Sequence, residues 1–530
     1  MSSTDSILDK LYTLPLLKGT FSLSGSTDES AKKLLEKLRD NHVKWHPHFD
    51  SRGFHNHLTH HLITIYGLGA SAPLIEAANE THMYQKPAFA SPSPITEENF
   101  IEHIGDLNYY DSYLKFFSAY VLDHTPVETI DRFIFSPEFN YIPNLDAGKK
   151  QPAMLERFES GLLHPMIHSA CGLEFGILGQ LAEGLAQTAT HPDHQTRLFP
   201  PALFNQDAAN SILKNFASLA LSSSSPTAPL RPTFTFHQRV LEEPAFAPGA
   251  AVSPDVMYKF EPVLEKVGDR IHQLVTEWYE GWLRGADSEA EIERRLEIMM
   301  EEVVFGNVMW FGISGWAWRG NGGAGKEFNA DFFAAHFATS TLFLPLFIIP
   351  GTSSMLSPPL SLANRLLLLR TYLSVNTAWY ISRGRSSLPI GEFFDATSSY
   401  LSAPLPPQRK STVPLEERTP AFWPGEVLKS GGNPWLRILQ NSIVHPDMHL
   451  CKLQRSLAYW AGKYGSRPAE YFSSAHGGLV GAERLDGTLF LRVAGLTEQR
   501  MGFANEGDEL GLWDRVAFYE GRKVDPKMMQ

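Results

Sequence analysis

The chain has 530 residues, of which 43% are hydrophobic and 20% charged, with a formal net charge of −12. This composition is typical of a large globular protein with ample core, and the length allows one domain or several. No segment concentrates lysine and arginine, which excludes the basic footprint of a nucleic-acid-binding protein and argues against an anionic membrane as partner.

Cysteine content and the chain ends bear on the compartment. The two cysteines, Cys171 and Cys451, argue against a disulfide framework and indicate a reducing environment. The first residues lack a basic segment followed by an apolar one, as a secretory signal would have. The most apolar stretch, residues 337–350, is interrupted by Pro345 and is too short to span a bilayer. We therefore expect a cytoplasmic protein without a membrane partner.

Helical periodicity dominates the chain, because apolar residues recur at intervals of three and four. The segments with this pattern are 30–41, 57–68, 97–122, 163–179, 271–283, 286–304 and 362–381. Asp287 and Ser288 are candidates for the N-cap of the sixth of these helices. The clearest strand pattern is at residues 488–493, after an Asp-Gly turn signal.

The fold class predicted from these patterns is mostly α. We expect one large helical domain over residues 1–530, with a single core around a central ligand cavity and minor short strands near the C-terminus. Segments rich in proline and serine predict loop excursions near 222–254 and 403–424, of which the second is the candidate for a lid.

Paired histidines are the strongest chemical signal. Three pairs stand four residues apart in helix-like patterns: His57 and His61, His164 and His168, and His445 and His449. On an α-helix this spacing places both imidazoles on one face. Imidazole is the commonest protein metal ligand and titrates near neutral pH. The pairs therefore predict a buried site that binds a metal, moves protons, or does both.

The segment from residue 163 to 179 has the most detailed pattern. His164, His168, Cys171 and Phe175 fall on one helical face, and Pro165 suits the first turn of a helix. At a helix start the dipole disfavours the imidazolium form, so the ring nitrogen stays free as a ligand or a base.

Several familiar site motifs are incomplete or missing in the sequence. None of the histidine pairs forms HExxH, and no Cys-x-x-Cys supports structural zinc. A carboxylate for a two-histidine iron site would have to come from another helix. Residues 320–325 match GxGxxG without a surrounding βαβ unit, so we read a loop and expect no Rossmann domain. Aromatic residues make up 12% of the chain, and such side chains suit the walls of a flat polyaromatic ligand site.

Two segments resemble the questin oxidase-like family, fungal Baeyer–Villiger-type oxygenases that open the central ring of anthraquinones in polyketide pathways. They are HNHLTHHLITIYGLGAS at 55–71 and HPMIHSACGLEFGILGQLAEGLAQTA at 164–189. LLRTYLSVNTAWYISRGR and HPDMHLCKLQRSLAYWAG look like later blocks of the same family. The likeness extends over residues 45–497.

The resemblance implies a helical fold, no flavin, dioxygen as oxidant, NADPH as reductant and a small aromatic polyketide as substrate. A separate NADPH-dependent reductase is then an expected partner. The resemblance also implies that His57, His61, His164 and His168 are active-site residues. It leaves open whether they hold Fe(II) or act as bases without a metal.

The mechanism expected from this resemblance begins with a hydroxyanthraquinone that NADPH has reduced to its hydroquinone. His164 or His168 deprotonates it, oxygen adds to a ring carbon, and the peroxide attacks the neighbouring carbonyl to give a lactone. Lys452 is the candidate for charge stabilisation, and His445 and His449 are secondary candidates for the site. The alternatives are a metal-dependent hydrolase on a helical scaffold and a non-catalytic protein that binds an aromatic ligand.

Overall fold

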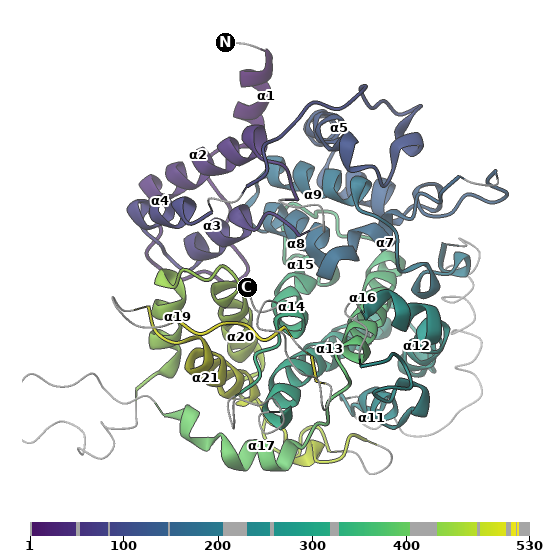
Figure 1. The fold of residues 1–530 in the computed structure, drawn as a ribbon, viewed down its shortest axis with the longest axis vertical. Helices are drawn as coiled ribbons and strands as arrows, with labels where there is room; N and C mark the ends of the chain where they lie inside the picture. Colours follow the sequence, from purple (N-terminus) through teal and green to yellow (C-terminus); the bar gives the residue numbers. More distant parts are fainter. Residues whose placement is uncertain are drawn as a thin grey trace, which may run out of the picture.

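The computed structural model shows a helical protein (Figure 1). It describes residues 3–48, 54–82, 85–146, 149–204, 231–254, 259–318, 328–402, 432–473, 478–504, 510–515 and 517–518. Within these ranges there is no β-sheet, and extended segments meet only in isolated bridges such as that between His48 and His55. The prediction of a mostly α fold is confirmed.

The α-helices fall into a long and a short set. The long ones are α2 (Asp28–Lys44), α3 (Leu58–Gly67), α5 (Tyr110–Asp123), α8 (Ser160–Phe175), α9 (Leu178–Thr190), α12 (Phe260–Leu283), α13 (Glu289–Ala317), α16 (Leu362–Ser382), α19 (Pro434–Val444), α20 (Leu450–Tyr464) and α21 (Leu489–Met501). The short ones are α1 (Ser3–Leu11), α4 (Ala72–Glu80), α6 (Pro126–Ile130), α7 (Met154–Phe158), α11 (Thr235–Glu242), α14 (Phe332–Ser340), α15 (Leu344–Ile348) and α17 (Ile390–Ala396).

Single helical turns of other kinds join these helices. The 3₁₀ turns are η1 (Phe100–His103), η2 (Leu107–Tyr109), η4 (Pro137–Phe139), η5 (Thr196–Leu198), η6 (Pro201–Phe204), η8 (Pro244–Phe246), η10 (Thr341–Phe343), η11 (Ser398–Leu401) and η13 (Ala482–Arg484). A π-helical turn, η3 (Asp131–Phe135), follows α6 directly.

The two halves of the chain form the two ends of the molecule in Figure 1. Helices α1 to α9 lie at the upper end, and α11 to α14, α16, α17 and α19 to α21 lie below them. Helix α3 contacts α20, and α8 contacts α14 and α15, so these helices join the halves. The histidine-rich segments lie at this junction.

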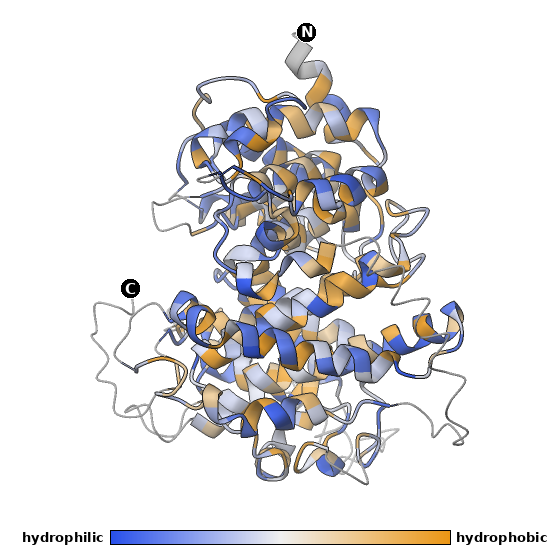
Figure 2. Cartoon of the chain, turned by 90° about the vertical axis from the view of Figure 1, so that its right-hand side faces the viewer, coloured by the Kyte–Doolittle hydropathy of each residue, from blue (hydrophilic) through white to orange (hydrophobic). Residues whose placement is uncertain are grey.

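The core is continuous. One cluster of buried apolar side chains extends from Leu11 to Ala517. Polar and apolar residues alternate along most helices in Figure 2, as in amphipathic helices packed on a core. The second half of α13 differs, because every residue from 299 to 316 is buried. This helix therefore runs through the centre of the lower half.

The structure corrects the predicted strand at 488–493, because residues 489–493 lie in helix α21 and Thr488 is its N-cap. The side chain of Asp486 accepts a hydrogen bond from the backbone N–H of Thr488 at 2.7 Å, so the Asp-Gly signal begins a helix rather than a hairpin. Leu489 and Val493 are buried one helical turn apart. Their spacing fits the helical period, which the short apparent alternation concealed.

The structure also corrects the predicted helical pair of His445 and His449, which lie in the connection between α19 and α20. Pro446 disfavours helical geometry in the residue before it, and His445 is extended with φ −71° and ψ 132°. The Asp447 carboxylate accepts the backbone N–H groups of His449 and Leu450 and so begins α20.

The other helix predictions agree with the structure except at two places. At 97–122 two 3₁₀ turns precede α5, and the predicted helix at 163–179 is divided, because Gly176 with φ 74° ends α8 and α9 begins at Leu178. Ser288 caps α13 as predicted, since its hydroxyl accepts the N–H of Glu291 at 3.3 Å. Residues 231–254 contain α11, whereas the rest of the first predicted loop, the loop at 403–424 and the glycine-rich segment at 320–325 lie outside the described residues. Among the described helices, none is both long and apolar enough to span a membrane.

Candidate active site

The start of helix α8 positions the first site residue. Gly161, Leu162 and Leu163 adopt left-handed backbone angles, with φ of 54°, 59° and 66°. Such angles are unfavourable for a leucine, by about 1 to 2 kcal/mol per residue, and they interrupt the helix. Regular helix restarts at His164, with Pro165 in its first turn as predicted.

Three histidines from separate helices meet beside this helix start. His57 precedes α3, His164 begins the regular part of α8, and His336 lies in α14. The Nε2 atoms of His57 and His164 are 2.7 Å apart. One nitrogen from each of the three rings lies within 4.8 Å of the other two, and all three side chains are buried. We call these residues the central triad.

Backbone carbonyl groups fix the tautomers of two triad members. The Nδ1–H of His164 donates to the carbonyl of Gly161, and the Nδ1–H of His336 donates to the carbonyl of Phe332 at 2.8 Å. A carbonyl only accepts, so the Nε2 of each neutral ring carries a lone pair. His57 then donates its Nε2–H to His164. At the centre of the triad the Nε2 lone pair of His164 therefore accepts the His57 proton, and the Nε2 lone pair of His336 has no partner among the described residues.

Burial keeps the triad uncharged near neutral pH. It lowers the pKa of His57 and of His164 well below 6.5, and that of His336 to about 3. The positive charge of Lys452 lowers all three values further. The rings are therefore neutral bases or ligands at pH 7.

Lys452, in α20, is a buried cation. None of the described residues forms a hydrogen bond or an ion pair with its ammonium group. Burial lowers its pKa from 10.5 to about 8. A buried positive charge without a partner is costly and is relieved by an anion, which suits the stabilisation of a phenolate.

His168 lies behind the triad in a separate hydrogen-bond network. Its Nε2–H donates to Glu183 at 3.0 Å, and its Nδ1 accepts from His60 at 2.9 Å and from Gln187 at 3.0 Å. Both ring nitrogens are thus engaged. This arrangement can orient and polarise His60, but it leaves no lone pair of His168 for a ligand.

Glu183, in α9, anchors this network. Its carboxylate also accepts hydrogen bonds from Tyr12 at 2.8 Å and from Asn41 at 3.1 Å, and it lies 3.0 Å from His42. Burial opposes ionisation of this carboxyl. The hydrogen bonds from His168 and His42 outweigh burial and lower the pKa of Glu183 to about 2. The group is a permanent buried anion.

Of the other predicted site residues, His449 reaches the central triad, whereas His61 and His445 do not. The Nδ1 of His61 lies 3.0 Å from the Nε2 of His82, away from the triad. His445 donates to the carbonyl of Met501 at 3.4 Å. His449 reaches the triad, with its ring centre 4.7 Å from that of His57.

The central triad opens onto a cavity of about 430 Å³, within the usual range for small-molecule sites. His57 and His164 line it, whereas Lys452 and His168 do not. The opposite wall is aromatic, with the ring centres of Phe260 and Trp379 4.0 Å apart.

Further groups complete the aromatic wall. Phe333 stacks on Trp379 at 5.5 Å, and the guanidinium of Arg383 lies 4.4 Å from the centre of the Phe333 ring. Arg383 is held by Asp331, with Nη2 to Oδ2 at 2.6 Å. This ion pair fixes a cation at the cavity edge and satisfies much of its charge.

The donor set of the triad fits a metal ion of the kind that imidazole binds, such as iron or zinc. Two rings are oriented by carbonyl groups, as metal-binding histidines commonly are. Of the four ligands expected from the resemblance, the structure brings together His57 and His164. The third nitrogen comes from His336, while His61 and His168 bond elsewhere.

Comparison with known proteins decides the family. The family model described as questin oxidase-like matches residues 54–457. The chain belongs to the questin oxidase-like family. It is 24% identical to a Baeyer–Villiger oxidase of Pestalotiopsis microspora, over 68% of this chain and 72% of that one.

Two relatives named questin oxidase add to this. The chain is 24% identical to the one from Aspergillus fumigatus, over 88% of this chain and 87% of that one. The one from Aspergillus terreus is 32% identical over 31% of this chain and 35% of that one. The predictions of the family and of an oxidoreductase of the oxygenase class are confirmed.

The sequence patterns missed His336 and Glu183. His336 is a single histidine in an apolar helix, so it does not belong to any pair of histidines four residues apart. Glu183 lies in α9, 15 residues after His168. A carboxylate inside an otherwise apolar helical segment was the available signal, because charged side chains are seldom fully buried unless they are paired.

Proposed function

We propose that this chain is a Baeyer–Villiger-type oxygenase that uses dioxygen to cleave the central ring of an anthraquinone in fungal polyketide metabolism. Its substrate is the hydroquinone that NADPH reduction produces. The observation that carries the proposal is the neutral His164 base, oriented by the Gly161 carbonyl and facing an aromatic-walled cavity. The names of the relatives support the reaction class.

The cavity suits a flat, electron-rich ligand. The stack of Phe260, Trp379 and Phe333 offers one continuous aromatic surface. A tricyclic substrate that lies against this surface presents its edge to the histidine wall. Offset stacking between such rings contributes about 0.5 to 1.5 kcal/mol beyond the area that is buried.

His164 acts as the general base. Its Nε2 exchanges the hydrogen bond from His57 for a phenolic proton of the substrate, and the resulting imidazolium keeps its Nδ1–H on the Gly161 carbonyl. The Lys452 charge favours the phenolate that forms. His60, held by His168 and Glu183, adds a second ordered imidazole behind the triad.

The overall reaction balances with the reductant. NADPH and a proton reduce the quinone, and charge moves from the phenolate onto ring carbon, which bonds to dioxygen. One oxygen atom is then inserted into a carbon–carbon bond to give a lactone, and the other leaves as water. Hydrolysis of the lactone gives a benzophenone. A separate NADPH-dependent reductase supplies the first step in this proposal.

Iron is compatible with the same site. His57, His164 and His336 would hold the ion, which would supply redox chemistry with dioxygen when bound. The metal-free route needs only the base and the Lys452 charge. We also propose a cytoplasmic location, which is supported by the free, buried thiols of Cys171 and Cys451.

The decisive experiment is single turnover of a chemically reduced hydroxyanthraquinone under ¹⁸O₂. We expect oxygen uptake and a ring-opened product that carries one labelled atom from dioxygen. Turnover without oxygen would instead indicate the hydrolase alternative. Binding without uptake, by protein tested both as purified and after loading with Fe(II), would indicate a protein that only carries the ligand. Metal content and activity are both measured before and after chelator treatment. Activity that is lost with the metal indicates the iron route, and activity that persists indicates the metal-free route.

A further inference from the structure

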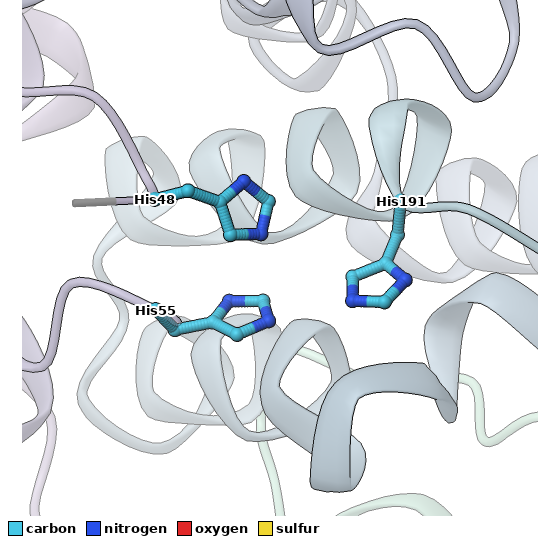
Figure 3. Close-up of side chains that lie close together, drawn as sticks. All are labelled: His48, His55 and His191. Atoms are coloured by element: carbon cyan, nitrogen blue, oxygen red, sulfur yellow. The ribbon is translucent and has the colours of Figure 1, made fainter. Parts of the chain in front are cut away.

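A second group of three histidines lines the same cavity (Figure 3). It consists of His48, His55 and His191, all buried, with one nitrogen from each ring within 4.8 Å of the other two. An isolated antiparallel bridge pairs the backbones of His48 and His55 and places their rings 4.4 Å apart. His191 follows the end of α9. We call these residues the outer triad.

The outer triad has unsatisfied nitrogen atoms. Both ring nitrogens of His48 and both of His55 are buried and have no hydrogen-bond partner among the described residues. The Nδ1–H of His191 donates to the carbonyl of Pro192 at 3.1 Å, so its Nε2 carries a lone pair. Buried polar atoms are almost always satisfied. Four such nitrogens in one place therefore indicate a binding site for a ligand.

One ring of the outer triad is oriented by the backbone, as two rings of the central triad are. The central triad uses carbonyl groups to orient two of its rings, and His191 is oriented in the same way.

Gly161 leaves the space that the outer triad needs. A Cβ atom on this residue would lie 2.5 Å from the Nε2 of His191 and 2.7 Å from the Nε2 of His55. The left-handed turn before His164 thus brings bare backbone against these two nitrogens. All three rings also line the cavity, so the side away from Gly161 is accessible to a ligand.

We propose that His48, His55 and His191 bind one divalent transition-metal ion, of which Zn²⁺ is the reference, with a further coordination position toward the cavity. Catalytic zinc sites commonly have three protein ligands, such as three neutral imidazoles, and a fourth position that is open to water or substrate. A water or a phenolate oxygen would fill the open position.

This site is separate from the central triad, although the two are adjacent. The rings of His55 and His164 stack with centres 4.4 Å apart, and no residue belongs to both groups. The proposal requires no particular activity of the protein, because metal binding is measured without turnover. Failure of the proposed oxygenase reaction would leave it unaffected.

The test uses the full chain after chelator treatment, titrated with Zn²⁺ or Co²⁺, with bound metal counted by mass spectrometry. The variants are His48→Ala and His191→Ala, and His336→Ala is the matched control from the central triad. We expect His48→Ala and His191→Ala each to bind one equivalent of metal less than the wild type and to lose the visible absorption bands of Co²⁺ at the outer triad. His336→Ala should retain these bands.

Two results would overturn the proposal. One is wild-type protein that binds no Zn²⁺ or Co²⁺, in which case water satisfies the orphan nitrogens. The other is His48→Ala and His191→Ala protein that binds as much metal as the wild type. Circular dichroism establishes that each variant is folded. His48→Gln, which keeps a polar side chain, replaces His48→Ala if the latter unfolds.

Discussion

The Nε2 atoms of His57 and His164 lie 2.7 Å apart, although 107 positions separate the residues in the chain. This contact joins the start of α3 to the restart of α8, and it exists because the left-handed turn at Gly161 directs His164 toward the cavity. A site built at such a junction depends on several helices at once. Because each residue of the site has different contacts, substitutions can distinguish their roles.

Replacing His164 with alanine should lower kcat by about 10² to 10⁴-fold, the usual contribution of a general base. The physical reason is the loss of the oriented Nε2 lone pair that faces the cavity. Oxygen uptake with reduced hydroxyanthraquinone measures the effect. His445→Ala is the control, because His445 bonds to the Met501 carbonyl rather than to the triad.

The control should retain the wild-type rate per folded molecule. Equal losses in His164→Ala and His445→Ala would show that both act through stability. A wild-type rate in His164→Ala would remove this residue from the mechanism.

Replacing Glu183 with glutamine should lower kcat by about 10 to 100-fold while KM changes little. The amide cannot supply the negative charge that holds His168, and through it His60, in one tautomer. Glu183 is a positioning residue, so its loss should also change the ¹⁵N chemical shifts of the His168 and His60 rings. Unchanged ring shifts with reduced activity would indicate a general packing defect instead.

Replacing Lys452 with methionine should lower kcat/KM by about 10² to 10³-fold at pH 7, as expected when a charge that stabilises an oxyanion is removed. The lysine pKa of about 8 means that its charge is present below pH 8 and lost above it. The wild-type pH profile should therefore fall near pH 8. Lys452→Met should lack this alkaline limb, and the difference between the two profiles should shrink by about tenfold per pH unit above pH 8.

The sequence predicted the helices better than the site, for identifiable reasons. The spacing of Leu, Ile and Val defines helix faces locally, so α2, α13 and α16 could be placed from the sequence. Pro165 in the first turn of a helix was also a local signal. Which face meets which neighbour depends on tertiary packing, and no local pattern records it.

His57 and His61 illustrate this limit. Helical spacing placed both rings on one face, but His57 precedes the helix with φ −98° and ψ 0°. Its ring turns to His164, while that of His61 turns to His82. His336 completes the triad from another helix, so a search for paired histidines could not have found it.

Replacing Trp379 with alanine should raise the Kd for a hydroxyanthraquinone by about tenfold, equivalent to about 1.4 kcal/mol. The indole forms the middle of the aromatic wall, between Phe260 and Phe333. Titration by visible absorbance measures the affinity. Trp379→Phe should retain most of it, and an unchanged Kd in Trp379→Ala would place the ligand elsewhere.

Replacing Glu302 with glutamine should stabilise the protein at alkaline pH. Glu302 is buried in α13, and burial raises its pKa from 4.5 to about 7, although it accepts a hydrogen bond from the indole of Trp282 at 3.1 Å. Between pH 4.5 and 7 the folded chain therefore binds a proton that the unfolded chain releases. The free energy of unfolding falls as pH rises through this window. The whole contribution of Glu302 to this fall is about 3 kcal/mol.

Glutamine can accept the same hydrogen bond and carries no charge at any pH. The variant should therefore match the wild type near pH 4.5 and exceed its unfolding free energy at pH 8.5. Denaturant unfolding at both pH values gives the difference, in which the other titrating groups cancel. Glu297→Gln, an exposed position on the same helix, is the control and should show no such pH-dependent gain. An equal gain in both variants would assign the effect to net charge rather than to the buried carboxyl.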